Sequence, residues 1–334
     1  MVVRTSVSGV RGRHSASGQK PPRVPIRVVL AALGACVVIT AGTVAGLTLA
    51  GAGTHAGTRP GGRSVPAAAA GTAAASATAS AAAVPAAAGR RDPFGKAAAS
   101  YLSGRDGIVL AAVYDLGTGR TWRIGRGGPQ AEASVVKLDV LETLLAERDQ
   151  GAGLTPADRA LAARMIEDSD NDAATRLWYK VGGAARIRSF NARAGLTRTV
   201  PSPCVICPGF AWPGWGLTTT TPDDQIALLR QLVTPDSMLT PTARRYALSL
   251  LENVIPAQRW GISAGVPARV TVALKNGWLP LRGRDGDWQV NSIGWVSGGG
   301  RDYLMAVLSA GNPSAKYGID TISQLAAMMW QHMG

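Results

Sequence analysis

The sequence is poor in histidine and cysteine. It has three histidines and three cysteines among 334 residues. His14 and His55 lie near the N-terminus and His332 lies near the C-terminus, which leaves no plausible partner for a Ser-His-Asp triad. Cys204 and Cys207 are the two thiols beyond the N-terminal region, and a closed zinc site needs four ligands. We therefore expect neither triad chemistry nor a metal, and no cofactor.

Acidic residues are almost absent from the N-terminal part of the chain. Residues 1–92 hold ten of the 35 basic residues and one of the 21 acidic residues, so that the rest of the chain carries a net charge of +5 out of +14. Most of the basicity therefore belongs to the N-terminal part. The remainder shows no basic run interleaved with aromatic residues, which argues against nucleic acid as a partner.

Residues 28–50 carry no charge and follow a leader without acidic residues. As a helix this run reaches about 35 Å, enough to cross a hydrocarbon core of about 30 Å. We predict a transmembrane signal anchor at residues 28–50. By the positive-inside rule, residues 1–27 form a cytoplasmic basic segment and everything after Ala50 lies outside the cell. The protein is then a single-pass protein of the cell membrane.

Two alternatives to a membrane-spanning anchor remain open. Small residues after Leu49 suit a signal peptidase, in which case the protein is secreted. Leu33–Cys36 also loosely matches a lipoprotein cleavage box, so that a lipid on Cys36 is a further route. Residues 51–92 are mostly Ala, Gly, Thr, Ser and Pro and predict a disordered linker with a coil-like reach of about 35 Å.

Residues 93–334 show the pattern of one α/β (α+β) domain, expected to be a monomer. Strands are predicted at 108–116, 121–124, 270–278, 290–296 and 303–310, and helices at 94–102, 134–147, 155–166, 172–180, 184–194, 223–233 and 319–333. Strands at both ends and helices in the middle predict an antiparallel sheet. Terminal helices would flank one side of it and an all-helical lobe the other.

Lysine is scarce in this domain, which has 20 Arg and five Lys. Unlike arginine, lysine can act as a base when its pKa is lowered. Ser134 and Lys137 form an S-x-x-K motif at a predicted helix start, one turn apart on one face. The alternative is a helix cap at Ser134 with a solvated Lys137.

Two further short motifs follow. Ser169-Asp170-Asn171 lies between two predicted helices and is either a catalytic S-D-N or a polar turn with Asx-type capping. Lys275-Asn276-Gly277 is a K-x-G at the end of an alternating strand. The alternative for the latter is an edge-strand lysine beside a β-bulge glycine.

In this order, and on helix, turn and strand, the three motifs resemble the penicillin-recognising serine enzymes, most closely the class A β-lactamases. The resemblance implies an acyl-serine hydrolase with Ser134 as nucleophile, Lys137 as base and Ser169 as proton donor to the leaving nitrogen. It also implies an electrostatic role for Lys275. Substrate contacts would come from Asn171, Asn276, Gly277 and Trp278, and the oxyanion hole from the backbone N–H groups of Ser134 and Trp278.

The sequence departs from this family in three places. From Ala173 to Pro222 it has no Asp or Glu, where the family carries the carboxylate that activates the deacylating water. Asn276 replaces the usual hydroxyl residue of K-[ST]-G. The stretch between S-x-x-K and S-D-N looks shorter than is typical, which would open one wall of the cleft.

The segment that lacks the glutamate contains Cys204 and Cys207, which could form a disulfide outside the cell or, less readily, a redox pair. Five tryptophans either stack on a wall sugar or peptide or belong to the core: Trp212, Trp215, Trp278, Trp288 and Trp295. Three functions remain: a hydrolase of a β-lactam or cell-wall peptide amide, a DD-peptidase-like penicillin-binding protein with slow deacylation, and a non-catalytic envelope binding module.

Overall fold

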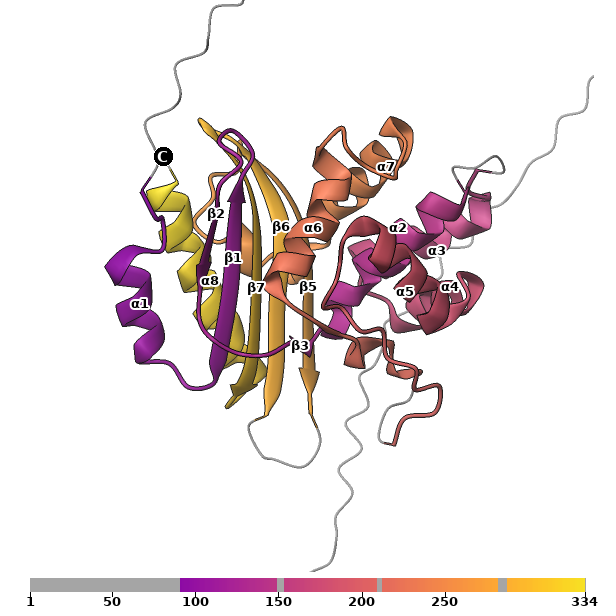
Figure 1. Ribbon diagram of the computed structural model, residues 1–334, viewed down its shortest axis with the longest axis horizontal. Helices are drawn as coiled ribbons and strands as arrows, with labels where there is room; N and C mark the ends of the chain where they lie inside the picture. Colours follow the sequence, from indigo (N-terminus) through magenta and orange to yellow (C-terminus); the bar gives the residue numbers. More distant parts are fainter. Residues whose placement is uncertain (1–90, 149–152, 209–211, 282–286, 334) are drawn as a thin grey trace, which may run out of the picture. The chain divides into compact units, whose positions relative to one another are not determined.

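The computed structural model describes residues 91–148, 153–208, 212–281 and 287–333. All of them fall in one compact unit, residues 79–334, built around a five-stranded antiparallel sheet of order β2-β1-β7-β6-β5 (Figure 1). The strands are β1 (Ile108–Asp115), β2 (Thr121–Ile124), β5 (Thr271–Pro280), β6 (Trp288–Gly298) and β7 (Arg301–Asn312). Two short strands, β3 (Gln130–Ala131) and β4 (Thr219–Thr220), pair separately. The predicted fold class is confirmed.

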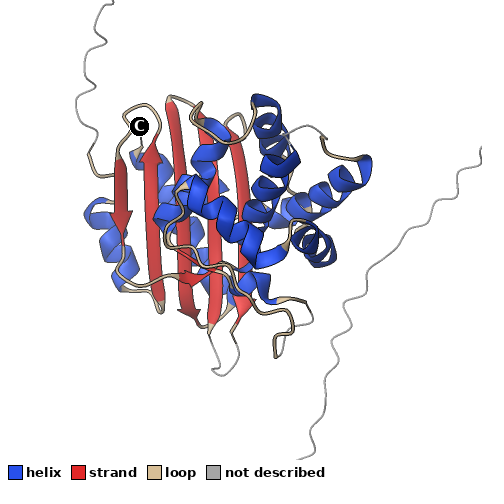
Figure 2. Cartoon of the chain, turned by 45° about the vertical axis from the view of Figure 1, so that its right-hand side comes forward, coloured by secondary structure: helices blue, strands red, loops and turns tan. Residues whose placement is uncertain are grey.

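Helices lie on both sides of the sheet (Figure 2). The terminal helices α1 (Gly95–Ser103) and α8 (Ala315–His332) cover one face. On the other side are α2 (Val136–Arg148), α3 (Pro156–Glu167), α4 (Asn171–Lys180), α5 (Gly183–Ala194), α6 (Pro222–Val233) and α7 (Pro241–Glu252). This is the predicted arrangement. No helix among the described residues is long and apolar enough to cross a membrane, and the predicted span 28–50 lies outside these residues.

Three of the helices begin with the same Thr-Pro pair. Thr155, Thr221 and Thr240 precede α3, α6 and α7, and each side-chain oxygen accepts the N–H of the third helical residue. Proline at the first helical position costs no hydrogen bond, because that N–H has no partner in a helix. The pair Thr155-Pro156 predicts α3, and Thr240-Pro241 carries the same signal, although no helix was predicted there.

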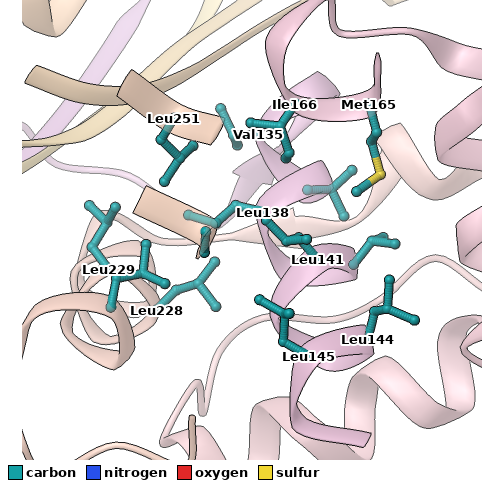
Figure 3. Close-up of a cluster of buried hydrophobic side chains, with 14 of the residues drawn as sticks. Val135, Leu138, Leu141, Leu144, Leu145, Met165, Ile166, Leu228, Leu229 and Leu251 are labelled. Atoms are coloured by element: carbon teal, nitrogen blue, oxygen red, sulfur yellow. The ribbon is translucent and has the colours of Figure 1, made fainter. Parts of the chain in front are cut away.

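Two clusters of buried apolar side chains form the core. The first fills the helical lobe around α2, where Leu138, Leu141 and Leu144 are at most 1% exposed (Figure 3). The second lies under α8 and includes Leu325 and Met329. Because both clusters consist of residues 94–333, this part of the chain carries its own core.

Helix α2 is enclosed on all sides, so that it buries polar side chains as well. Every residue from Val136 to Ala146 is buried. Asn191 donates to Asp139 at 2.8 Å, whereas the carboxyl oxygens of Glu142, and of Glu132 just before the helix, have no hydrogen-bond partner among the described residues. Burial raises the pKa of Glu132 and of Glu142 well above the ordinary value, and that of Asp139 to about 7. Burial therefore favours their protonated forms.

We expect Glu142→Met to stabilise the protein at pH 8 and to have less effect at pH 5. The raised pKa means that the unfolded chain ionises first as pH rises, so that stability is lost above about pH 4.5, the unperturbed value. Each unit of pKa difference corresponds to about 1.4 kcal/mol. Urea unfolding at both pH values measures the effect, with Glu252→Met as an exposed control. A variant less stable than wild type at pH 8 would contradict this account.

Candidate active site

The S-x-x-K motif lies where the helical lobe meets the sheet. Ser134 belongs to a short 3-10 helix, η1 (Ala133–Val135), which leads directly into α2. Ala133 has a φ of 51°, a left-handed conformation that is strained for a residue with a Cβ. Lys137 is fully buried, so that the alternative of a solvated lysine is wrong.

Lys137 reaches the S-D-N turn. Its Nζ donates to the Ser169 carbonyl oxygen at 2.5 Å, to Ser169 Oγ at 3.0 Å and to Asn171 Oδ1 at 2.8 Å. It also lies 5.1 Å from the ring centre of Trp215. No hydrogen bond from Lys137 to the Ser134 hydroxyl is present among the described residues, although the spacing of the motif predicted that they would be within reach.

The S-D-N turn combines the two alternatives that the sequence left open. Asp170 caps α4 by accepting the N–H of Ala173 at 2.7 Å, and it forms an ion pair with Arg164. Ser169 has a φ of 57°. With Ala133, it is one of the two non-glycine residues with positive φ in the described chain. Capping thus fixes the turn, while its strained serine faces the lysines.

The second lysine contacts the same serine. Lys275 is 1% exposed on β5, and its Nζ donates to Ser169 Oγ at 3.0 Å and to the Asn276 carbonyl oxygen at 2.9 Å. A hydroxyl has two lone pairs and one O–H. Because the lysines occupy both lone pairs of Ser169 Oγ, its proton is left to point elsewhere. This is the geometry of a hydroxyl ready to donate a proton.

Burial lowers the pKa of both lysines. The pKa of Lys137 falls to about 6, first because of burial and second because of the charge of Lys275, although Asp170 opposes the change. Burial alone lowers the pKa of Lys275 to about 7. Lys137 therefore loses its proton first. The neutral amine has two N–H groups and a lone pair that can accept a proton, so that one of the three hydrogen bonds donated by Nζ must be given up or reversed when it forms.

Gly277 allows β5 to approach the start of α2. A Cβ at this position would lie 2.5 Å from Ser134 N and 2.9 Å from Val135 N. The pairing of β5 with β6 is regular here, with Gly277 opposite Asn291, so that the alternative of a β-bulge glycine is wrong. Glycine is needed at position 277 because the backbone of Ser134 and Val135 occupies the space that a side chain would fill.

A cleft of about 400 Å³ opens over these groups. Its described lining includes Ser134, Ser169 and Asn171, together with four of the five tryptophans that the sequence left undecided: Trp212, Trp215, Trp278 and Trp288. The fifth, Trp295, packs against the core and donates to Asp302. Asp168 and Gln258 also line the cleft and were missed from the sequence. Asp168 stands directly before the S-D-N motif, whereas no local signal marks Gln258.

The family model of the beta-lactamase enzyme family matches residues 148–333, more than half of the chain. The chain belongs to this family. The match begins after Lys137, so that the S-x-x-K motif lies outside it.

Solved structures with this fold include three β-lactamase-like proteins. An ancestral class A β-lactamase has a TM-score of 0.57 and 24% identity, and covers 71% of this chain and 98% of its own. PBP-A has a TM-score of 0.59 at 21% identity, with 71% and 94% covered. A β-lactamase from Chitinophaga pinensis has a TM-score of 0.61 at 18% identity, with 71% and 97% covered. These proteins consist almost wholly of the shared domain.

Among curated proteins, a Mycobacterium tuberculosis protein named lipoprotein LppW is 30% identical over 208 residues, 60% of this chain. Its Mycobacterium bovis counterpart matches equally. The chain spans about 62% of the length of these relatives.

In this member of the beta-lactamase family, the segment without acidic residues is held by a disulfide. Cys204 and Cys207 are bonded, and the Cys204 carbonyl oxygen accepts the N–H of Gly214 at 2.8 Å. The next residue, Trp215, donates to Thr175 Oγ1 at 3.2 Å and lines the cleft. The disulfide therefore helps to position one aromatic wall of the cleft.

Asn276, predicted to bind substrate, is buried and turned away from the cleft. Its amide donates to the carbonyl oxygens of Gln258 at 2.7 Å and Trp260 at 3.0 Å. It is absent from the described lining of the cleft, as is Gly277. Of the four predicted substrate contacts, Asn171 and Trp278 line the cleft.

Proposed function

We propose that this beta-lactamase family member is a serine hydrolase that is acylated at Ser134 by the amide of a β-lactam or of a cell-wall peptide. One observation carries the proposal. Ser169 Oγ accepts hydrogen bonds from both buried lysines and shares a cleft with Ser134. A binding module without chemistry would not need two buried lysines around one hydroxyl, because each costs free energy to bury.

In the proposed reaction, Ser134 Oγ bonds to the carbonyl carbon of the substrate while neutral Lys137 accepts its proton. The N–H groups of Ser134 and Trp278 stabilise the oxyanion. The proton passes through Ser169 Oγ to the substrate nitrogen as the C–N bond breaks. This leaves an amine and an ester at Ser134, and water must cleave the ester to release the acid.

We propose that this last step is slow, as in a DD-peptidase-like penicillin-binding protein. From Ala173 to Pro222 the chain has no Asp or Glu that could activate water. The single carboxylate in the described cleft lining is Asp168. Without a base for the water, the ester should persist.

The test is the intact mass of the unit 79–334 during incubation with benzylpenicillin. We expect an adduct of penicillin mass that forms on wild type and on Ser100→Ala, a matched control on exposed α1, and that is absent from Ser134→Ala. The lifetime of the adduct should be many times longer than the time it takes to form.

Other outcomes would change the proposal in different ways. Rapid product release without an adduct would overturn slow deacylation while retaining the serine hydrolase. Neither adduct nor turnover would overturn β-lactam chemistry and favour the non-catalytic envelope module.

We also propose that the domain is anchored at the outer face of a membrane. The relatives named as lipoproteins support anchoring in general. The route is either the predicted span 28–50 or a lipid on Cys36, both outside the described residues. A lipid mass on the wild-type chain that is absent from Cys36→Ala would support the lipid route. A wild-type chain that keeps residues 1–50 and carries no lipid would support the span.

A further inference from the structure

The surface of α4, α5 and the segment after them is strongly basic. Residues 173–222 contain six basic residues and no acidic one. Lys180 forms an ion pair with Asp158, and Arg186 pairs with Glu147 at 2.7 Å. The other four are exposed and have no ion pair among the described residues: Arg176, Arg188, Arg193 and Arg198. Helix α4 also carries one exposed acid, Asp172, so that this surface keeps a net positive charge.

Exposed apolar side chains lie beside one of these cations, Arg188. Tyr179 is 53% exposed, Val205 51% and Ile206 92%. Tyr179, Arg188, Pro203 and Val205 line a surface hollow of about 520 Å³, and Ile206 follows directly in the chain. The Cys204–Cys207 disulfide closes a short loop around Val205 and Ile206, which holds both at the surface. We call Tyr179, Arg188, Pro203, Val205 and Ile206 the docking patch.

We infer that the docking patch binds the surface of an anionic lipid bilayer. Arginines next to anionic headgroups are attracted to them, and exposed aliphatic tips gain free energy by entering the boundary with the acyl chains. Tyrosine favours the same boundary because it is amphipathic. A soluble polyanion would satisfy the arginines but would leave Ile206 in water, which is why the bilayer is the better partner.

The disulfide loop of the docking patch is hydrogen-bonded to a segment that lines the cleft. The Gly214 N–H donates to the Cys204 carbonyl oxygen, and Trp215 beside it lines the cleft. A bilayer bound at Val205 and Ile206 would thus hold the cleft near its surface. If the domain is also tethered, even weak docking would suffice, because a tether raises the effective concentration of the bilayer. The inference itself depends on neither the tether nor the acylation of Ser134.

The test uses the unit 79–334, which lacks the predicted anchor, in flotation with vesicles. We expect binding to phosphatidylcholine vesicles that contain phosphatidylglycerol, little binding to phosphatidylcholine alone, and loss of binding as salt is added. Arg188→Gln should weaken binding about five-fold, since each surface cation contributes about 1 kcal/mol. Ile206→Ser should weaken it about ten-fold, from the lost burial of its side chain.

Matched controls separate the patch from general charge and apolar exposure. Arg269→Gln and Ile255→Ser change exposed residues outside the patch and should leave binding unchanged. Equal binding to both kinds of vesicle, or no binding to either, would overturn the proposal. Loss with Arg188→Gln but not with Ile206→Ser would also overturn it and indicate a soluble polyanion as the partner. The penicillin adduct should form normally in both patch variants.

Discussion

Lys137→Ala is expected to slow the acylation of Ser134 by about 10²–10⁴-fold, the usual contribution of a positioned base. Burial and the charge of Lys275 lower the pKa of Lys137 to about 6, so that at neutral pH its amine is free to accept the serine proton. Alanine removes this acceptor. It also removes the N–H donors to Ser169 and Asn171. The rate of adduct formation, followed by intact mass over time, measures the loss.

The pH dependence distinguishes a base from a residue that only supports the fold. For wild type, we expect the acylation rate to rise as pH increases through about 6, because below it Lys137 is an ammonium group and cannot accept a proton. The variant should lose this dependence. Lys96→Ala, an exposed lysine on α1, serves as the control and should keep both the rate and the pH profile. A variant that is slower but retains the rise near pH 6 would show that another group is the base.

Gly277→Ala is expected to reduce acylation by about 10²–10³-fold, the cost of losing one oxyanion-hole donor. The added Cβ would meet Ser134 N at 2.5 Å and the Glu132 carbonyl oxygen at 3.1 Å, both of them backbone atoms that cannot rotate away. Either β5 or η1 must move, and the Ser134 N–H then loses its alignment with the oxyanion.

The same assay, with a thermal melt of each protein, separates this effect from unfolding. Gly128→Ala is the matched control, because a Cβ there meets nothing within 4 Å. We expect the Gly277 variant to melt cooperatively and to form the adduct slowly. If it is acylated at the wild-type rate, the Ser134 N–H is not part of the oxyanion hole.

Much of the fold could be predicted because its signals are local. Alternating apolar residues mark the long strands, and Thr-Pro caps mark helix starts, including the one at Thr240 that was overlooked. The burial of α2 could not be predicted in the same way. Whether Lys137 is solvated or enclosed depends on α3–α7 packing around it, and the sequence near Lys137 does not specify that packing.

The candidate site also has features that could be predicted from local sequence and features that could not. The three motifs are short patterns, and the side chains of Ser169, Lys137 and Lys275 do meet. The direction of the Asn276 amide and the place of Gln258 depend on contacts between segments distant in the sequence. The roles of these residues in catalysis remain predictions for the experiments above.

The hydrogen bonds of Asn276 have a consequence for redesign. Its amide ties the edge strand to the segment 258–260, and two carbonyl oxygens depend on it. A Ser or Thr side chain is shorter and has one O–H, so that installing the family's hydroxyl would leave at least one of these oxygens without its donor. Asn276 makes a structural contact here, and introducing K-T-G would require a second change in the segment that Asn276 holds.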